Sequence, residues 1–89
     1  MTRILLVEDS RIVRKSIVSL LNCQPDIEIM GEVSSGIEAI DIVRASKIDI
    51  VLLDINLPDT SGFDVAPKVL QIAPNTAISL GTSYPPCAR

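Results

Sequence analysis

The sequence contains almost no aromatic residues: only Phe63 and Tyr84 among its 89 residues. Because apolar residues still make up 47% of the chain, the core has to be built from aliphatic side chains. An excess of positive charge is also missing, since the net charge is −3. Surfaces that bind nucleic acid are normally basic, so we expect no direct contact with nucleic acid.

Long hydrophobic runs and paired cysteines are absent as well. No apolar stretch approaches the length that crosses a bilayer, and the first three residues lead into a short aliphatic run rather than a signal peptide. Cys23 and Cys87 form no CxxC pair and are more typical of reduced thiols than of a disulfide framework. These features predict a single small cytoplasmic domain without a membrane segment.

Four short aliphatic runs, at residues 3–7, 27–33, 50–53 and 76–81, are predicted to be strands. The run at 50–53 is continuous, which is typical of a strand buried on both faces of a parallel sheet. The run at 27–33 alternates, as expected of an edge strand or a half-covered one.

Segments with helical periodicity separate the strands. Ser10 is a candidate cap for the first helix, and the third is expected to begin at Asp64 or shortly before, which leaves Pro67 in its first turn. The residues predicted to face inward are Val13, Ile17, Leu20 and Leu21 in the first helix, Ile37, Ala39, Ile40 and Val43 in the second, and Ala66, Val69, Leu70 and Ala73 in the third. This βαβαβαβ order predicts an α/β fold, a parallel sheet with helices on both faces, over residues 1–83, followed by an irregular tail at 84–89.

Acidic residues follow two of the predicted strands. Glu8 and Asp9 come after the first strand and Asp54 comes after the third. If these strands are neighbours, the three carboxylates meet at the carboxyl edge of the sheet, where ligands bind in open α/β folds. Their mutual repulsion favours a hard divalent cation such as Mg²⁺, with the carbonyl of Asn56 as a further ligand. Asp54 could then act as a nucleophile toward a phosphoryl group, and the Thr82 hydroxyl could donate to that group.

The same residues also fit plainer roles. A Glu-Asp pair after a strand often caps a helix or forms a solvated turn, and an aspartate such as Asp54 often begins a turn. Gly62 is interpreted as a backbone requirement rather than a ligand, and Arg11, Arg14 and Lys15 as a solvated helix face.

Three motifs resemble the receiver domain of bacterial two-component response regulators. They are ILLVEDS at residues 4–10, DINLPDTSG at 54–62 and GTS at 81–83. The resemblance implies a flavodoxin-like fold in which Asp54 accepts a phosphoryl group from a histidine kinase. It further implies that Glu8, Asp9, Asp54 and the carbonyl of Asn56 hold Mg²⁺, and that Thr82 is the switch hydroxyl.

The sequence departs from that family after Thr82. A complete receiver continues with another helix, a fifth strand that ends in a lysine, and a last helix. None of these is present here. We therefore expect a truncated receiver with four strands and three helices, impaired switching, and self-association through an exposed edge strand or by exchange of elements.

Two other functions are alternatives to a phosphoacceptor domain. A degenerate receiver could act as an interaction module that needs no phosphorylation. A Mg²⁺-dependent phosphohydrolase is disfavoured, because enzymes of the haloacid dehalogenase type have a second aspartate two residues after the nucleophile, where this chain has Asn56. GxGxxG and P-loop motifs are also absent, so no enzymatic activity is expected.

Overall fold

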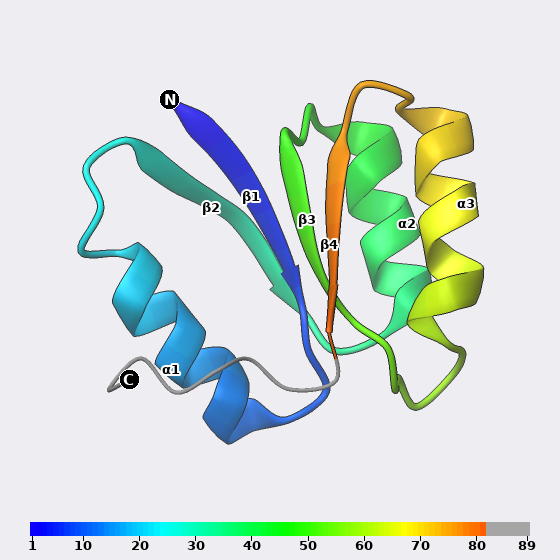
Figure 1. Cartoon of the computed structure of the whole chain (residues 1–89), viewed down its shortest axis with the longest axis horizontal. Coiled ribbons are helices and arrows are strands. Elements are labelled where there is room, and N and C mark those ends of the chain that lie inside the picture. Colours follow the sequence, from blue (N-terminus) through cyan, green and yellow to red (C-terminus); the bar gives the residue numbers. More distant parts are fainter. Residues whose placement is uncertain (82–89) are drawn as a thin grey trace.

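The centre of the fold is a parallel sheet of four strands in the order β2-β1-β3-β4. The structure is a computed structural model that describes residues 1–81. Its strands are β1 (Thr2–Val7), β2 (Ile27–Val33), β3 (Ile50–Asp54) and β4 (Ala77–Gly81). The helices are α1 (Arg11–Leu21), α2 (Gly36–Ala45) and α3 (Gly62–Ile72). In Figure 1, α1 lies on one side of the sheet and α2 and α3 lie together on the other, which confirms the predicted fold class.

A serine caps the start of each helix. The hydroxyls of Ser10, Ser35 and Ser61 accept hydrogen bonds from the amides of Val13, Glu38 and Phe63, respectively. Each cap satisfies one of the first-turn N–H groups that have no partner within a helix. These caps explain why the helices begin where they do.

The third helix starts shortly before Asp64, as predicted, but the predicted position of Pro67 is wrong. Ser61 caps α3, which begins at Gly62, so Pro67 lies inside the helix and not in its first turn. An interior proline removes one backbone hydrogen bond. The burial of Val65 and Val69 against the sheet offsets that loss and keeps the helix continuous.

The core is aliphatic, as the shortage of aromatic residues predicts. It lies between the sheet and the α2–α3 layer and is formed by Leu5, Val7, Val33, Ala39, Val43, Ile48, Val51, Leu53, Val65 and Val69. The aromatic ring of Phe63 takes no part in it and is 61% exposed. Fully burying side chains of this size is worth about 1.5–3 kcal/mol each, so this layer supplies most of the stability.

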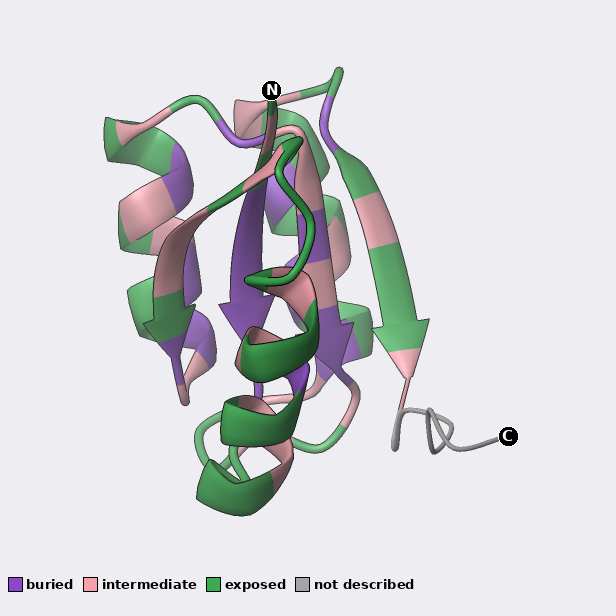
Figure 2. Cartoon of the chain, turned by 90° about the vertical axis from the view of Figure 1, so that its left-hand side faces the viewer, coloured by how far each residue is buried: buried purple, intermediate pink, exposed green. Residues whose placement is uncertain are grey.

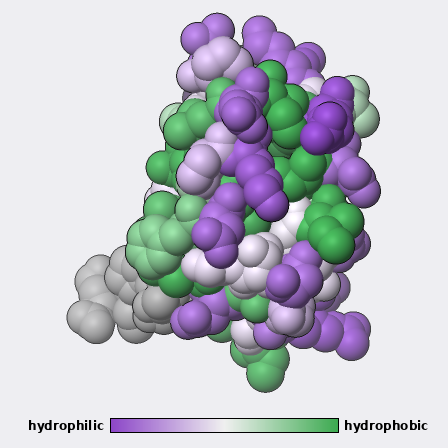
Figure 3. Space-filling model, turned by 90° about the vertical axis from the view of Figure 1, so that its right-hand side faces the viewer, coloured by the Kyte–Doolittle hydropathy of each residue, from purple (hydrophilic) through white to green (hydrophobic). Residues whose placement is uncertain are grey.

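Three residues predicted to face inward are instead exposed. They are Leu20 in α1, Ile37 in α2 and Leu70 in α3, with exposed fractions of 45%, 68% and 43%. On the face that α2 and α3 cover, Figure 3 shows hydrophobic side chains interspersed with hydrophilic ones. Each of these residues lies at one edge of the apolar stripe of its helix, and side chains nearer the other edge are buried. In α3 the buried side chain is Val65, which is 2% exposed.

The two faces and the two edges of the sheet are covered unequally. In Figure 2, β1 is buried over most of its length, from Ile4 to Val7, whereas β4 is mostly exposed. Among the described strands, β4 pairs only with β3, and β2 is the opposite edge, as its alternating pattern predicted. No helix among residues 1–81 is long and apolar enough to cross a membrane.

Candidate functional site

The strand order brings two acidic residues to one edge of the sheet. β1 and β3 are parallel neighbours, and Val7 pairs with Leu53. Glu8 and Asp54, the next residue of each strand, therefore emerge side by side at the carboxyl edge, as the sequence predicted. Both side chains are buried, with exposed fractions of 3% for Glu8 and 5% for Asp54.

The Glu8 carboxyl group is only half satisfied. Its Oε2 atom accepts a hydrogen bond of 3.0 Å from the amide of Ser10. Its Oε1 atom is buried and has no N–H or hydroxyl partner in the described part of the chain. Burial raises the pKa of Glu8 above its ordinary value, and the adjoining Asp54 carboxyl group raises it further through a shared hydrogen bond and its charge. Burial and the neighbouring Asp54 carboxyl group therefore both disfavour the charged form of Glu8.

Asp9, the third predicted acid, lies apart from this pair. It is exposed, and it acts on Glu8 through its charge alone, with the smallest effect on the Glu8 pKa. Of the two acids that follow β1, Glu8 is the one buried beside Asp54. Residues 1–81 contain no group of three or more Asp, Glu, His or Cys side chains placed to hold a metal ion.

The loop after Asp54 is held by local hydrogen bonds that backbone amides donate. The Asn56 amide donates to Asp54 Oδ1 at 3.3 Å, the Leu57 amide donates to the Thr60 carbonyl at 3.2 Å, and the Gly62 amide donates to the Ile55 carbonyl at 2.7 Å. A Cβ on Gly62 would lie only 2.5 Å from the Asp54 carbonyl oxygen. The interpretation of Gly62 as a backbone requirement is therefore confirmed.

Sequence reasoning missed two polar residues near the site. Arg14, predicted to be solvated, donates from Nη1 to the Glu8 carbonyl at 2.8 Å, and its Nε lies 3.9 Å from a carboxylate oxygen of Glu32. Asp59 accepts two backbone hydrogen bonds from the start of α2. The contacts of Arg14 with Glu32 and of Asp59 with α2 join segments far apart in the chain, and no local pattern marks them.

The remaining predicted site residue is Thr82. β4 ends at Gly81, which pairs with Asp54. Thr82 follows Gly81 and lies outside the described residues, as do Tyr84 and Cys87.

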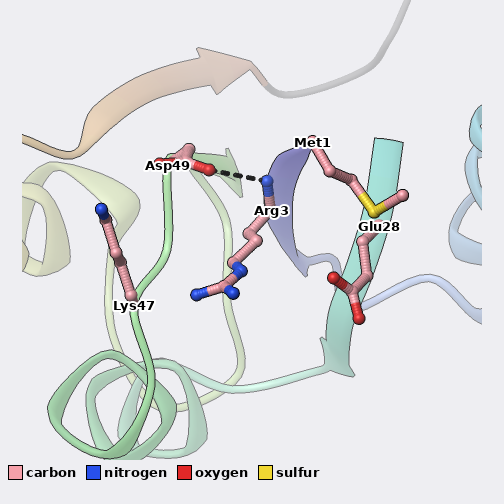
Figure 4. Close-up of a pocket in the computed structure, with 5 residues that line it drawn as sticks. All are labelled: Met1, Arg3, Glu28, Lys47 and Asp49. Carbon is pink, nitrogen blue, oxygen red and sulfur yellow. Dashed lines mark hydrogen bonds between the residues drawn. The ribbon is translucent and has the colours of Figure 1, made fainter. Parts of the chain in front are cut away.

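A hollow of about 420 Å³ opens at the other end of the sheet, away from Asp54 (Figure 4). Arg3 and Lys47 line it together with Glu28, Asp49 and Met1, and the Arg3 amide donates to Asp49 Oδ2 at 2.8 Å. Two cationic and two acidic side chains give it no net charge that would select an ion. The acidic edge around Asp54 is therefore the stronger candidate site.

Known proteins match this arrangement over nearly the whole chain. The family model described as "Response regulator receiver domain" matches residues 4–87. The transcriptional regulatory protein YhcZ of Bacillus subtilis is 35% identical over 92% of this chain, and the chain spans 38% of that protein.

Two solved structures show the same fold. The response regulator domain of Thermotoga maritima CheB has a TM-score of 0.84 at 26% identity, covering 90% of this chain and 59% of that one. The response regulator MaeR, bound to beryllium trifluoride, has a TM-score of 0.84 at 26% identity, covering 96% of this chain and 70% of that one. Together with the buried acids at the carboxyl edge of the sheet, these matches show that the chain belongs to the response regulator receiver family, the phosphoacceptor domains of two-component signalling.

Proposed function

We propose that Asp54 is the phosphoacceptor of this receiver domain and takes its phosphoryl group from a histidine kinase. The observation that carries this proposal is the buried Glu8–Asp54 pair at the carboxyl edge of the sheet, with Glu8 Oε1 left without an N–H or hydroxyl partner in the described residues. Beryllium trifluoride is a mimic of a phosphoryl group, so its presence on the related MaeR supports the same chemistry here.

The residues at this edge fit a magnesium ion. Mg²⁺ is commonly held by one or two carboxylates together with water and phosphate oxygens, and the buried pair offers two carboxylates with one oxygen to spare. In this proposal Glu8, Asp9, Asp54 and the carbonyl of Asn56 hold the ion, with Asp9 contributing from its exposed position. When bound, the ion supplies positive charge that offsets the charge of the transferring group.

The chain itself orients the nucleophile. The Asn56 amide fixes Asp54 Oδ1, and the strand holds the rest of the residue. An ionised Asp54 oxygen forms the bond to phosphorus while the bond from phosphorus to the leaving group breaks, and that group departs with the electron pair. Thr82 is proposed as the hydroxyl that then interacts with the phosphoryl group.

Phosphorylation with a small donor tests this role. Incubation with acetyl phosphate and Mg²⁺ is expected to add one phosphoryl group, seen by intact mass, and Asp54→Ala is expected to reduce that adduct to background. Asp41→Asn, which changes an exposed acid on α2, is the control and should be labelled like the natural chain. An adduct that persists in Asp54→Ala would assign the acceptor to another residue, and no adduct in any form would favour a phosphorylation-independent interaction module.

We also propose that the chain self-associates through β4. In the described residues this strand is paired on one side only, and Leu80 is 40% exposed on it. Unpaired strand edges pair readily with another copy. At micromolar concentration, size-exclusion chromatography with light scattering should give at least twice the mass of the chain. A charged residue on the edge, Ser79→Lys, should restore the monomer, while Asn75→Lys in the preceding turn should not. A monomeric natural chain would refute this.

The remaining assignments follow from composition and family. We propose a cytoplasmic location and no enzymatic activity for the chain itself. Its net charge of −3 supports the absence of direct contact with nucleic acid.

A further inference from the structure

We infer that Asp59 is a positioning residue that ties the loop carrying the acceptor site to the start of α2. Its effect on phosphoryl transfer rests on the function proposed above, but its effect on the loop does not. Asp59 is not part of the acid pair, because among the described residues it forms no hydrogen bond with Glu8 or Asp54.

Both carboxylate oxygens of Asp59 take part in the contact. Asp59 Oδ1 accepts from the Gly36 amide at 2.9 Å, and Oδ2 accepts from the Ile37 amide at 3.1 Å. Both amides belong to the first turn of α2, where N–H groups have no partner within the helix and the helix dipole favours negative charge. These hydrogen bonds hold the pKa of Asp59 below its ordinary value, so the group is a carboxylate at neutral pH.

Packing around Gly36 makes the contact specific. Gly36 is buried, and a Cβ at this position would lie 2.5 Å from the Thr60 methyl group and 2.8 Å from a Val65 methyl group. A side chain at residue 36 would therefore push the loop away from α2. The same arrangement explains the exposure of Ile37, because its amide points at Asp59 while its side chain turns outward.

The loop transmits this anchoring to the acceptor. Thr60, the neighbour of Asp59, accepts from the Leu57 amide, and Leu57 follows Asn56, whose amide donates to Asp54 Oδ1. Only a few bonds therefore separate the Asp59 anchor from the Asp54 carboxylate and from the carbonyl proposed as a Mg²⁺ ligand. A loop released from α2 would hold both groups in a broader range of positions.

Hydrogen exchange and phosphorylation of the full chain test this inference together. In Asp59→Ala, exchange of the Leu57 and Gly62 amides should accelerate about tenfold or more, and labelling by acetyl phosphate with Mg²⁺ should slow by about tenfold or more, since small misplacements of reacting groups have large effects on rate. Asp59→Asn keeps the shape and one carbonyl oxygen and should be intermediate. Asp64→Ala, which removes an exposed acid from the first turn of α3, should match the natural chain in both measurements.

Each outcome decides the matter. If exchange accelerates only at Gly36 and Ile37 and labelling keeps its natural rate, Asp59 is merely a helix cap and the inference is overturned. If the natural chain takes no phosphoryl group, the proposed function fails, yet exchange at Leu57 and Gly62 still tests the anchoring. If Asp59→Ala does not fold, the comparison of Asp59→Asn with Asp64→Ala takes its place.

Discussion

Replacing Gly62 with alanine is expected to lower the free energy of unfolding by about 1–3 kcal/mol, the usual range for overpacking. The added Cβ would meet the Asp54 carbonyl oxygen at 2.5 Å and the Ile55 Cα at 2.9 Å. Both are backbone atoms of the acceptor segment, so no side-chain rotation can relieve the clash. Because alanine is otherwise the better helix former, a loss of stability in the first turn of α3 would have to come from this clash. Urea unfolding measures the change.

Gly31 in β2 provides the matched comparison. A Cβ there would lie 2.9 Å from the terminal methyl of Ile42, which is the end of a flexible side chain. We expect Gly31→Ala to change stability by less than about 1 kcal/mol, because that methyl can turn aside and glycine is itself unfavourable within a strand. Equal losses for the two variants would show that the Asp54 backbone yields as easily as the Ile42 side chain. The Gly62 variant should also be phosphorylated more slowly, since its clash displaces Asp54 itself.

The strands and the position of the acid pair could be predicted from the sequence because local chemistry specifies them. Short aliphatic runs such as residues 50–53 have few ways to bury both faces other than as central strands. Once parallel strands are neighbours, their carboxyl ends share an edge, and Glu8 and Asp54 follow from the chain order alone. The helix starts were also marked, by serines such as Ser10 and Ser35 that cap them.

The orientation of each helix was harder to predict. Periodicity identifies an apolar stripe but leaves open which margin of the stripe meets the sheet. In α3, Leu70 and Val65 lie at opposite margins of the stripe, and Val65 is the one that is buried. In α2, the hydrogen bond from the Ile37 amide to Asp59 coincides with an outward side chain. These choices depend on contacts between segments, which one sequence does not display.

The polar contacts of single side chains had no sequence signal either. Arg14 has the pattern of any exposed basic residue on a helix, yet it donates to the Glu8 carbonyl. Asp59 has the pattern of a turn residue, yet it accepts from Gly36 and Ile37. Both contacts surround the acid pair rather than form it, so the sequence could identify the centre of the site but not the residues that hold it in place.

At pH 7 and without Mg²⁺, Glu8→Gln is expected to raise the free energy of unfolding by about 1–3 kcal/mol. This is the cost of leaving a buried polar group without a partner, which the substitution removes. Glu8 is 3% exposed, and its Oε1 has no N–H or hydroxyl partner among residues 1–81. The amide of glutamine carries no charge and can donate a hydrogen bond to Asp54. Unfolding in urea at pH 7 gives the difference between the two proteins.

The same substitution should remove a dependence of stability on pH. Because the folded chain raises the pKa of Glu8 above 4.5, the folded state holds more protons than the unfolded state between that value and the raised one. The free energy of unfolding of the natural chain should therefore fall as the pH rises through this range, and Glu8→Gln should show a smaller fall. Glu28→Gln, which changes an exposed acid on β2, should keep the natural slope.

Mg²⁺ should reverse the order of stability of the natural chain and Glu8→Gln. An ion that binds only the folded state stabilises it by about 2.7 kcal/mol at 100 times its dissociation constant, and the natural chain should gain in this way when Mg²⁺ binds the carboxylates of Glu8 and Asp54. Glu8→Gln lacks one of the two buried carboxylates and should lose most of that gain, whereas Glu28→Gln should keep it. Equal gains in all three proteins would place the ion elsewhere and remove Glu8 from the site, because an ion held by Glu8 cannot stabilise the glutamine variant to the same extent.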